Sequence, residues 1–358
     1  MTDTRLGLIG AGAVGVLHAE AATATPGVRV TAVCDLLAET AHRVAGPLGA
    51  AVFTDHRDLI ASGTVDAVVV NTPHALHTDI VTGSAAAGLH VLVEKPMATR
   101  SEDCAVMEAA CADNGVVLFV GHIQHFLPPV AAAKAALDAG TVGEVLAVHD
   151  WRSTDYRRGS RPSWFFDPAI SGGGVFINIG THCVDRLLWL TGRRPMAVAA
   201  TAVRRGDLPV ETDVLARLDL GDGVVGHITV TSTLLPARDE LTVIGERGTI
   251  RVARGTGAVL HPDDGTGPVL LAEDRADDVP TAFLDQLAAF AAAVRGEQPP
   301  AVPAAHGRQV VETIEAVYAS CADGGRATRR PPTRPLRRSR THRTSLPWPS
   351  RVSSATPA

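Results

Sequence analysis

The chain has 358 residues, of which 46% are hydrophobic and 20% are charged, so it is long enough to bury two hydrophobic cores. Its formal net charge is −5, and removing the nine arginines from Arg326 onward, a segment with no acid, takes the first 325 residues to −14. A body this acidic excludes nucleic acid as an expected partner. No apolar run approaches the roughly 20 residues that a membrane span needs, so we also expect no membrane partner.

The cysteine pattern gives no sign of a disulfide or metal framework. The number of cysteines is odd, and no two of them are spaced as C-x-x-C. The chain also leads from Met1 into an apolar run without a targeting segment. We therefore expect reduced thiols, a cytoplasmic location and no bound metal. The five cysteines are Cys34, Cys104, Cys111, Cys183 and Cys321.

Short apolar runs alternate with helical stretches over the first third of the chain. The runs predicted as strands cover 6–9, 29–34, 67–70, 90–93 and 116–120. The stretches predicted as helices cover 13–24, 37–48, 74–87 and 101–114. This alternation predicts a parallel, doubly wound α/β sheet with right-handed crossovers.

A glycine-rich loop lies between the first predicted strand and the first predicted helix. Gly10, Gly12 and Gly15 form G-x-G-x-x-G, which permits a tight turn, close approach of a pyrophosphate and close helix packing. Asp35 ends the second strand, where its carboxylate can accept from ribose hydroxyls and repel a 2′-phosphate. Two leucines follow it and supply no cation, so we predict NAD rather than NADP. The alternative is that Asp35 only caps the next helix.

A lysine follows the fourth predicted strand. Glu94, Lys95 and Pro96 come directly after the apolar run His90 to Val93, and proline stops the strand because it lacks a backbone donor. Ligands of open α/β sheets bind at this carboxyl edge. Lys95 is therefore a candidate catalytic residue, although a Lys-Pro turn can also be a solvated surface turn.

The pattern changes after Gly121 to a run of strands joined by short glycine-containing turns. Strands are predicted at 145–149, 196–203, 214–220, 224–231, 241–244 and 249–252, and helices at 180–190, 281–295 and 307–322 would cover one face of the antiparallel sheet. We expect three parts: a dinucleotide-binding domain over 1–123, an α+β domain over 124–325, and a disordered basic tail over 326–358. A basic interaction arm is the alternative for the tail.

Five motifs in this order resemble the glucose-fructose oxidoreductase, inositol dehydrogenase and rhizopine catabolism (Gfo/Idh/MocA) family, over residues 5 to 322. The resemblance implies an N-terminal Rossmann domain and a C-terminal α+β domain with a large, mostly antiparallel open sheet. In the family this open sheet often forms oligomer contacts, so we expect a homo-oligomer, a dimer or a tetramer. The motifs are Gly10-Ala11-Gly12-Ala13-Val14-Gly15, Ala32-Val33-Cys34-Asp35, Asn71-Thr72-Pro73 with His77, Glu94-Lys95-Pro96, and Gly172-Gly173-Gly174 leading to Gly180-Thr181-His182-Cys183-Val184-Asp185.

The resemblance also implies roles for site residues. Lys95 would lie near the nicotinamide and the reactive hydroxyl, and His182 would exchange the proton, since an ordinary histidine titrates near pH ~6.5. Asn178 stands where inositol dehydrogenases of the family have an aspartate, and it can orient a hydroxyl but cannot ionise. His77 would contact the cofactor or cap a helix. The residues expected to bind NAD are Gly10, Gly12, Ala13, Val14, Gly15, Asp35, Asn71, Thr72, Pro73, His77, Glu94 and Lys95.

A polar, aromatic loop over 152–164 is expected to form part of the substrate pocket. Its four arginines suit a phosphate or a carboxylate, or they lie on a solvated surface. Asp185 is expected to orient His182 or to pair with Arg186 or another cation. The residues expected to contact substrate are His122, Tyr156, Arg161, Trp164 and Asp185.

The expected function is NAD-dependent oxidation of a secondary hydroxyl group on a sugar, a sugar derivative or a cyclic polyol such as inositol. Asn178 keeps a nucleotide-linked sugar open as the substrate of a dehydrogenase or ketoreductase. Two further alternatives are an NAD-dependent glycoside hydrolase and a dinucleotide sensor without turnover. The presence of both Lys95 and His182 argues against the sensor.

Overall fold

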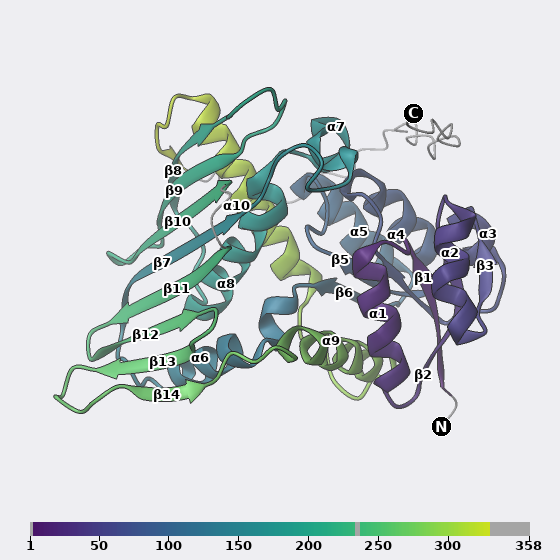
Figure 1. Ribbon diagram of the computed structural model, residues 1–358, viewed down its shortest axis with the longest axis horizontal. Coiled ribbons are helices and arrows are strands. Elements are labelled where there is room, and N and C mark those ends of the chain that lie inside the picture. The colour runs from purple at the N-terminus through teal and green to yellow at the C-terminus, as the bar shows by residue number, and fades with distance from the viewer. Residues whose placement is uncertain (1–2, 233–236, 330–358) are drawn as a thin grey trace.

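A computed structural model describes residues 3–232 and 237–329 of the chain. Two β-sheets stand on opposite sides of the molecule, and helices α8 and α10 lie between the second sheet and the first domain (Figure 1). Each sheet has its own hydrophobic core. The predicted combination of a Rossmann domain and an α+β domain is confirmed.

The first sheet has six parallel strands in the order β3-β2-β1-β4-β5-β6 within the described residues. All four residues of β4 are buried, as expected for a central strand covered on both faces. The strand order reverses between β1 and β4, which is where ligands of such sheets bind. The strands are β1 (Thr4–Ile9), β2 (Val28–Cys34), β3 (Ala51–Phe53), β4 (Ala67–Val70), β5 (His90–Glu94) and β6 (Leu118–Gly121).

The second sheet has nine strands in the order β14-β13-β12-β11-β7-β10-β9-β8-β15 over the part of the chain that the structure describes. Its neighbours are antiparallel except for β7 and β10, which are parallel. Buried and exposed residues alternate along β9, so one face packs on a core and the other faces outward. The strands are β7 (Val145–Thr154), β8 (Ala197–Val203), β9 (Asp213–Asp219), β10 (Val225–Ser232), β11 (Arg238–Gly245), β12 (Gly248–Ala253), β13 (Gly257–Pro262), β14 (Val269–Ala272) and β15 (Thr328–Arg329).

The helices connect and cover these sheets. The α-helices are α1 (Ala13–Ala24), α2 (Ala38–Ala45), α3 (His56–Ala61), α4 (His77–Ala86), α5 (Ser101–Asp113), α6 (Pro128–Asp138), α7 (Pro168–Ser171), α8 (Thr181–Thr191), α9 (Asp278–Val294) and α10 (Ala304–Ala322). Short 3-10 helices are η1 (Gly46–Leu48), η2 (His74–Leu76), η3 (Ile123–Phe126) and η4 (Ser163–Phe166), and η5 (Phe176–Gly180) is a π-helix.

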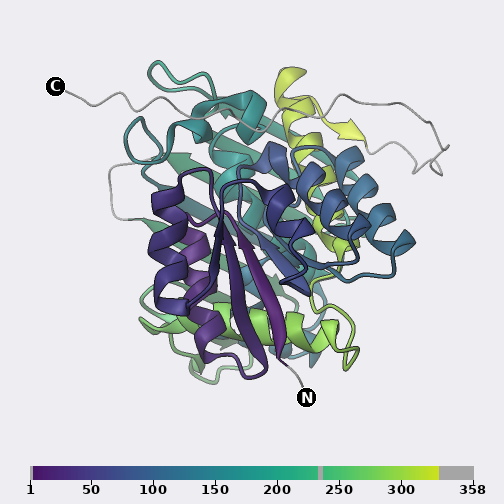
Figure 2. The same ribbon diagram turned by 90° about the vertical axis from the view of Figure 1, so that its right-hand side faces the viewer.

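One helix covers a different sheet from the one predicted. The segment 281–295 was expected to cover the second sheet, but Phe283, Leu287 and Phe290 of α9 belong to the core of the first sheet. Both views place α9, drawn in green, beside the Rossmann domain, where it contacts α1 (Figures 1 and 2). Helical periodicity predicts that a helix has an apolar face but not which sheet that face will cover.

The domain boundary at 123/124 stays a prediction.

Several elements are longer than predicted or were missed. The segment Arg152 to Thr154, predicted as the start of a loop, continues β7, because β10 and β11 pair with it on both sides. The missed strands and α-helices are β3, α3, α6, α7, β13, β14 and β15, and all of them except α6 have six residues or fewer. Residues Thr328 and Arg329 of the predicted disordered tail form β15, and residues 330–358 lie outside the described residues.

Among the described helices, none is both long and apolar enough to cross a membrane.

Candidate active site

The glycine-rich loop leaves the first turn of α1 open. Gly10 has a positive φ of 96°, and a Cβ at Gly15 would lie 2.3 Å from the Gly10 carbonyl oxygen, so both positions require glycine. A Cβ at Gly12 would meet nothing within 4 Å, and no side chain caps the helix. Gly12, Ala13 and Val14 are exposed. Free amides beside open space fit the pyrophosphate of a dinucleotide.

Asp35 is tied to this loop. Its Oδ2 accepts from the Ala11 backbone N–H at 2.9 Å, and its Oδ1 accepts from the Leu37 backbone N–H at 3.0 Å. Leu37 is itself the N-cap residue of α2, so the carboxylate closes a turn before the helix rather than capping an amide within it. The aspartate therefore stands beside the glycine loop, where a ribose hydroxyl would reach it.

His77 holds two loops of the first domain together. Its ring is fully buried, with Nε2 at 2.9 Å from the Thr72 carbonyl oxygen and Nδ1 at 3.1 Å from the Pro96 carbonyl oxygen. These contacts connect the loop after β4 with the loop after β5. The Asn71 side chain donates to the Gly10 carbonyl at 3.4 Å, which extends the connection to the glycine loop. Thus His77 contacts backbone on both ring nitrogens and positions the loops around it.

The buried carboxylate of Glu94 fixes the backbone at the end of β5. One carboxylate oxygen lies 3.0 Å from Nε2 of the buried His18, and the other accepts from the Lys95 backbone N–H at 3.1 Å. Burial raises the pKa of Glu94, but His18 and the charge of Lys95 outweigh it and hold the pKa below its ordinary value. The carboxylate thus stays ionised and orients the backbone that carries the lysine.

Lys95 joins the two domains. Its Nζ donates to the Asn178 carbonyl oxygen at 3.1 Å, and the Lys95–Pro96 peptide bond is cis. Burial lowers the pKa of Lys95 to about 8; the Glu94 carboxylate opposes this shift, and the charges of Arg152 and Arg161 add to it. The lysine is therefore poised to gain or lose a proton close to neutral pH.

His182 lies in the first turn of α8, directly after the π-helix η5, and a short π-segment is frequently found at functional sites. The residue is partly exposed, and its buried Nδ1 has no hydrogen-bond partner among the described residues. Burial lowers the pKa of His182 well below its ordinary value, the charges of Lys95 and Arg152 lower it further, and Asp185 opposes them. The imidazole is thus unprotonated at neutral pH and able to accept a proton.

Asn178 lies within η5 and is buried. Its backbone carbonyl accepts from Lys95, so its position is fixed from the first domain. Its Nδ2 lies close to the Tyr156 hydroxyl and yet forms no hydrogen bond of good geometry within the described chain. An amide without a partner can hold a substrate oxygen.

Two residues that no sequence motif predicted, Glu211 and Tyr318, hold the glycine segment before η5. Glu211 accepts from the backbone N–H of Gly174 at 2.8 Å and of Phe176 at 3.0 Å. The Tyr318 hydroxyl donates to Glu211 at 2.8 Å and accepts from the Ile177 backbone N–H at 3.1 Å. Burial raises the pKa of Glu211, and these hydrogen bonds oppose the shift. Helix α10 thereby sets the position of the segment that leads to His182.

We expect Tyr318→Phe to destabilise the protein by about 1–3 kcal/mol, because it leaves the Ile177 amide and the Glu211 carboxylate each short of one partner. Urea denaturation followed by circular dichroism measures the loss. Tyr156→Phe is the matched control, since the Tyr156 hydroxyl donates only to the Phe165 carbonyl, and it should cost about 0.5–1.5 kcal/mol. Equal midpoints for wild type and Tyr318→Phe would contradict this role.

The four arginines expected in the substrate loop divide into two pairs. Arg157 and Arg158 are exposed and pair with Asp155 and Asp207, respectively. Arg152 and Arg161 are instead partly buried, and their charges reach Lys95. Nη1 of Arg152 and Nε of Arg161 lack hydrogen-bond partners in the described part of the chain. Arg152 and Arg161 thus each have a nitrogen near the site that could bind an anionic group.

The aromatic residues of this loop pack against the second core and against the first domain. Tyr156 is 1% exposed and packs in the second core, with the Arg161 guanidinium 5.2 Å from its ring centre. It therefore lies behind the site rather than at its surface, and burial raises the pKa of Tyr156 to about 12. Trp164 stacks on Phe165 at 3.8 Å and meets the ring of His74 edge-on at 5.0 Å. These contacts hold the loop against the first domain.

His122 and Asp185 come together at the domain junction. Both side chains are fully buried, and His122 Nδ1 lies 3.6 Å from Asp185 Oδ1. Burial lowers the pKa of His122 to about 4, although Asp185 opposes the shift. The same Asp185 oxygen lies 2.9 Å from Nε2 of His125 and 2.7 Å from Nε2 of His306. Asp185 is therefore surrounded by histidines and does not pair with Arg186, one of the alternatives that the sequence left open.

Arg186 belongs to a separate buried network. It donates to Asp150 at 2.7 Å and to Asp239 at 2.8 Å, and Asp239 also pairs with Arg152. Burial raises the pKa of Asp239, but these two arginines outweigh it and hold the pKa far below its ordinary value. The network thus connects Arg152, whose charge reaches Lys95, with the buried Arg186.

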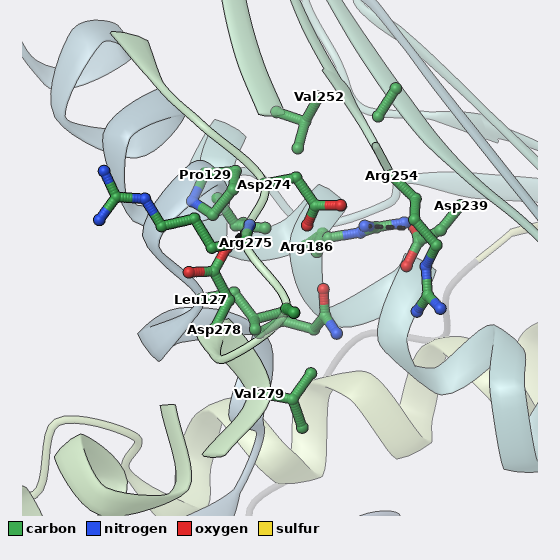
Figure 3. A pocket seen from close by; sticks show the side chains of 14 residues that line it. Leu127, Pro129, Arg186, Asp239, Val252, Arg254, Asp274, Arg275, Asp278 and Val279 are labelled. Atoms are coloured by element: carbon green, nitrogen blue, oxygen red, sulfur yellow. Dashed lines mark hydrogen bonds and ion pairs between the residues drawn. The ribbon is translucent and has the colours of Figure 1, made fainter. Parts of the chain in front are cut away.

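A cavity of about 270 Å³ opens beside this network. Arg186 and Asp239 meet in one wall, with Arg254 and Asp274 close by (Figure 3). Neither Lys95 nor His182 lines it. The cavity is therefore separate from the site, although Arg152 connects the two through Asp239.

A parallel sheet with an open glycine loop, joined through a lysine to an α+β domain with a histidine at a helix start, defines a two-domain, dinucleotide-dependent oxidoreductase. Residues 4–122 match the family model "Oxidoreductase family, NAD-binding Rossmann fold", and residues 130–251 match the "GFO/IDH/MocA C-terminal domain". The chain belongs to the Gfo/Idh/MocA family, and the first domain is an NAD-binding domain. The resemblance predicted from the sequence motifs is confirmed.

The chain is similar to several named proteins over most of its length. It is 32% identical to the rhizopine catabolism protein MocA of Rhizobium meliloti, over 64% of this chain and 72% of that protein. It is 29% identical to levoglucosan dehydrogenase of Pseudarthrobacter phenanthrenivorans, over 64% of this chain and 68% of that protein. The crystal structure of GenD2 from gentamicin A biosynthesis, in complex with NAD, superposes with a TM-score of 0.83 at 27% identity and covers 93% of this chain and 97% of that chain.

Proposed function

We propose that this protein is an NAD-dependent dehydrogenase that oxidises a secondary hydroxyl group of a sugar, a sugar derivative or a cyclic polyol. The observation that carries the proposal is the hydrogen bond from Lys95 Nζ to the Asn178 carbonyl. It brings a lysine from the edge of the NAD-binding sheet against the segment that leads to His182. The similarity to levoglucosan dehydrogenase supports a sugar-like substrate.

Bound NAD would supply the hydride acceptor. The open amides of α1 would hold its pyrophosphate, and Asp35 would accept from its ribose hydroxyls. His182 takes the proton of the substrate hydroxyl, since its pKa lies well below the ordinary value and the ring is unprotonated at neutral pH. Lys95 and the Asn178 amide hold the reacting oxygen, the lysine by donating from its protonated form.

Asp35 is proposed to select NAD. The double substitution Asp35→Ser with Leu36→Arg removes the repelling carboxylate and adds a cation for a 2′-phosphate. We expect the ratio of kcat/KM for NADP to that for NAD to rise roughly 100-fold, which corresponds to about 3 kcal/mol from charge-assisted hydrogen bonds. Steady-state kinetics with both cofactors measures it. An unchanged preference for NAD would remove Asp35 from this role.

A substrate screen tests the proposed reaction. The purified chain is incubated with NAD and a panel of inositols, free sugars, anhydrosugars and nucleotide sugars, and NADH absorbance is followed. We expect NADH with at least one free sugar or polyol, and NADH formation at least about 100-fold slower with the Lys95→Ala variant. Cleavage of a glycoside without net NADH would instead support the hydrolase, and cofactor binding without turnover of any compound would support the sensor.

A nucleotide-linked sugar is the second candidate substrate. Arg152 and Arg161 each keep a nitrogen without a partner in the described part of the chain, which suits a phosphate. Arg161→Ala should then raise KM for a nucleotide sugar at least about tenfold and leave KM for a free polyol unchanged. Arg158→Ala, at an exposed position, is the matched control.

We also propose that the protein forms a homo-oligomer through the outward face of the second sheet. Trp151 of β7 and Leu215 of β9 both pair with Thr229 of β10, and their side chains are 42% and 52% exposed. Large apolar side chains exposed on the outward face of a sheet are typical of an interface. Leu215→Asp should convert the oligomer to monomers in light scattering, and a monomeric wild type would rule the interface out.

A cytoplasmic location remains our proposal. The five cysteines are free in the structure, and four of them are buried. Unpaired thiols are typical of a reducing compartment.

A further inference from the structure

Three histidines lie around the carboxylate of Asp185 in α8: one from α10, one from η3 and one from the residue before η3. Oδ1 of this carboxylate lies 2.7 Å from Nε2 of His306 at the start of α10 and 2.9 Å from Nε2 of His125 in η3. Nδ1 of His122, the residue before η3, lies 3.6 Å from the same oxygen. The ligand atoms of His125, Asp185 and His306 all lie within 4.8 Å of one another. Three side chains that ordinarily bind metal thus converge on one point, and His122 is a fourth such side chain beside the carboxylate.

Hydrogen bonds do not complete this cluster. Both ring nitrogens of His122 and the second oxygen of Asp185 lack partners within the described residues, and both side chains are fully buried. Buried polar atoms are nearly always hydrogen-bonded, so a group of three orphans requires an explanation. A cation bound between Nδ1 of His122 and Oδ1 of Asp185 would give that ring nitrogen the partner it lacks.

We propose that His122, His125, Asp185 and His306 bind one Zn²⁺ ion. Three imidazole nitrogens and one carboxylate oxygen are a tetrahedral donor set that zinc accepts. Zinc bonds of about 2.0–2.2 Å place tetrahedral ligand atoms roughly 3.4 Å apart, close to the 3.6 Å between His122 and Asp185. The two shorter separations would each widen by less than about 1 Å. This site departs from the expectation, drawn from the cysteines, that no metal is bound.

The site is structural because the protein fills all four positions. Trp189 stacks on His125 with ring centres 3.9 Å apart and so fixes the plane of that imidazole, as neighbours of metal ligands commonly do. The ion would clamp η3 and α10 to α8. Since Asp185 follows His182 by one helical turn, this clamp would set the position of the helix that carries the proposed base.

Metal content and spectroscopy test the proposal without relying on activity. The full chain is stripped with a chelator and then titrated with Zn²⁺ by calorimetry, with Co²⁺ as a visible-absorbing substitute. We expect one tight site per chain, a tetrahedral Co²⁺ spectrum and a rise in Tm on adding zinc. His306→Gln, at a partly exposed side chain that is expected to tolerate the change, should weaken zinc binding more than about tenfold and abolish the Tm rise.

His149→Ala is the matched control. His149 stacks on His227 on the outward face of the second sheet, where adventitious zinc would bind. This variant should keep the tight site and the Co²⁺ spectrum. The proposal is overturned if wild type and His306→Gln bind zinc equally, if His149→Ala abolishes binding, or if zinc fails to bind wild type at all. In the last case the cluster is a hydrogen-bonded His-Asp-His group.

Discussion

His182→Ala is expected to lower kcat on the active sugar or polyol by about 10²- to 10⁴-fold, the usual contribution of a positioned general base. The imidazole is unprotonated at neutral pH because burial and the charges of Lys95 and Arg152 hold its pKa well below the ordinary value. The variant removes the proton acceptor and leaves the glycine loop and Asp35 untouched. NAD affinity, measured by calorimetry, should therefore stay within about twofold of wild type.

Two further measurements separate lost chemistry from lost structure. Added imidazole should restore part of the His182→Ala rate, because a small base can occupy the vacated space. His261→Ala, at an exposed position on β13, should keep the wild-type rate. A near-normal kcat for His182→Ala would transfer the role of base to Lys95, whose pKa of about 8 also suits proton exchange.

Much of the first domain could be predicted because its signals are local. The strand, glycine loop and first helix follow one another within about twenty residues, and the predicted helix 13–24 matches α1. The lysine after β5 was placed at the sheet edge because parallel strands all end at the same edge. By contrast, the very short β3 and α3 lack enough residues to show a clear period.

The rest of the site depends on contacts between distant parts of the chain. His306 reaches Asp185 across 121 residues, and Tyr318 reaches Glu211 across 107, and no local pattern marks such pairs. Arg152 was placed in a loop because its polar neighbours hid the last part of β7, which runs between β10 and β11. The hydrogen bonds from Glu211 and Tyr318 to the start of the π-helix before α8 likewise join distant parts of the chain.

Lys95→Ala is expected to lower kcat/KM by about 10²- to 10³-fold, the cost of removing one donor aimed at a reacting oxygen. The pH profile gives the sharper test. Because burial lowers the pKa of Lys95 to about 8, the ammonium donor is present below that pH and is lost as pH rises through it. We therefore expect kcat/KM for wild type to fall on the alkaline side with a midpoint near 8 if the protonated lysine is the active form.

Lys95→Arg gives the matched comparison, because arginine keeps its charge at every pH that the enzyme tolerates. Its rate should be reduced by the different shape of the guanidinium, but the alkaline decline near pH 8 should disappear. A decline that persists at the same midpoint in Lys95→Arg would assign the titration to another group. A rate that instead rises with pH through 8 in wild type would make the neutral lysine the active form, and Lys95 rather than His182 would then be the proton acceptor.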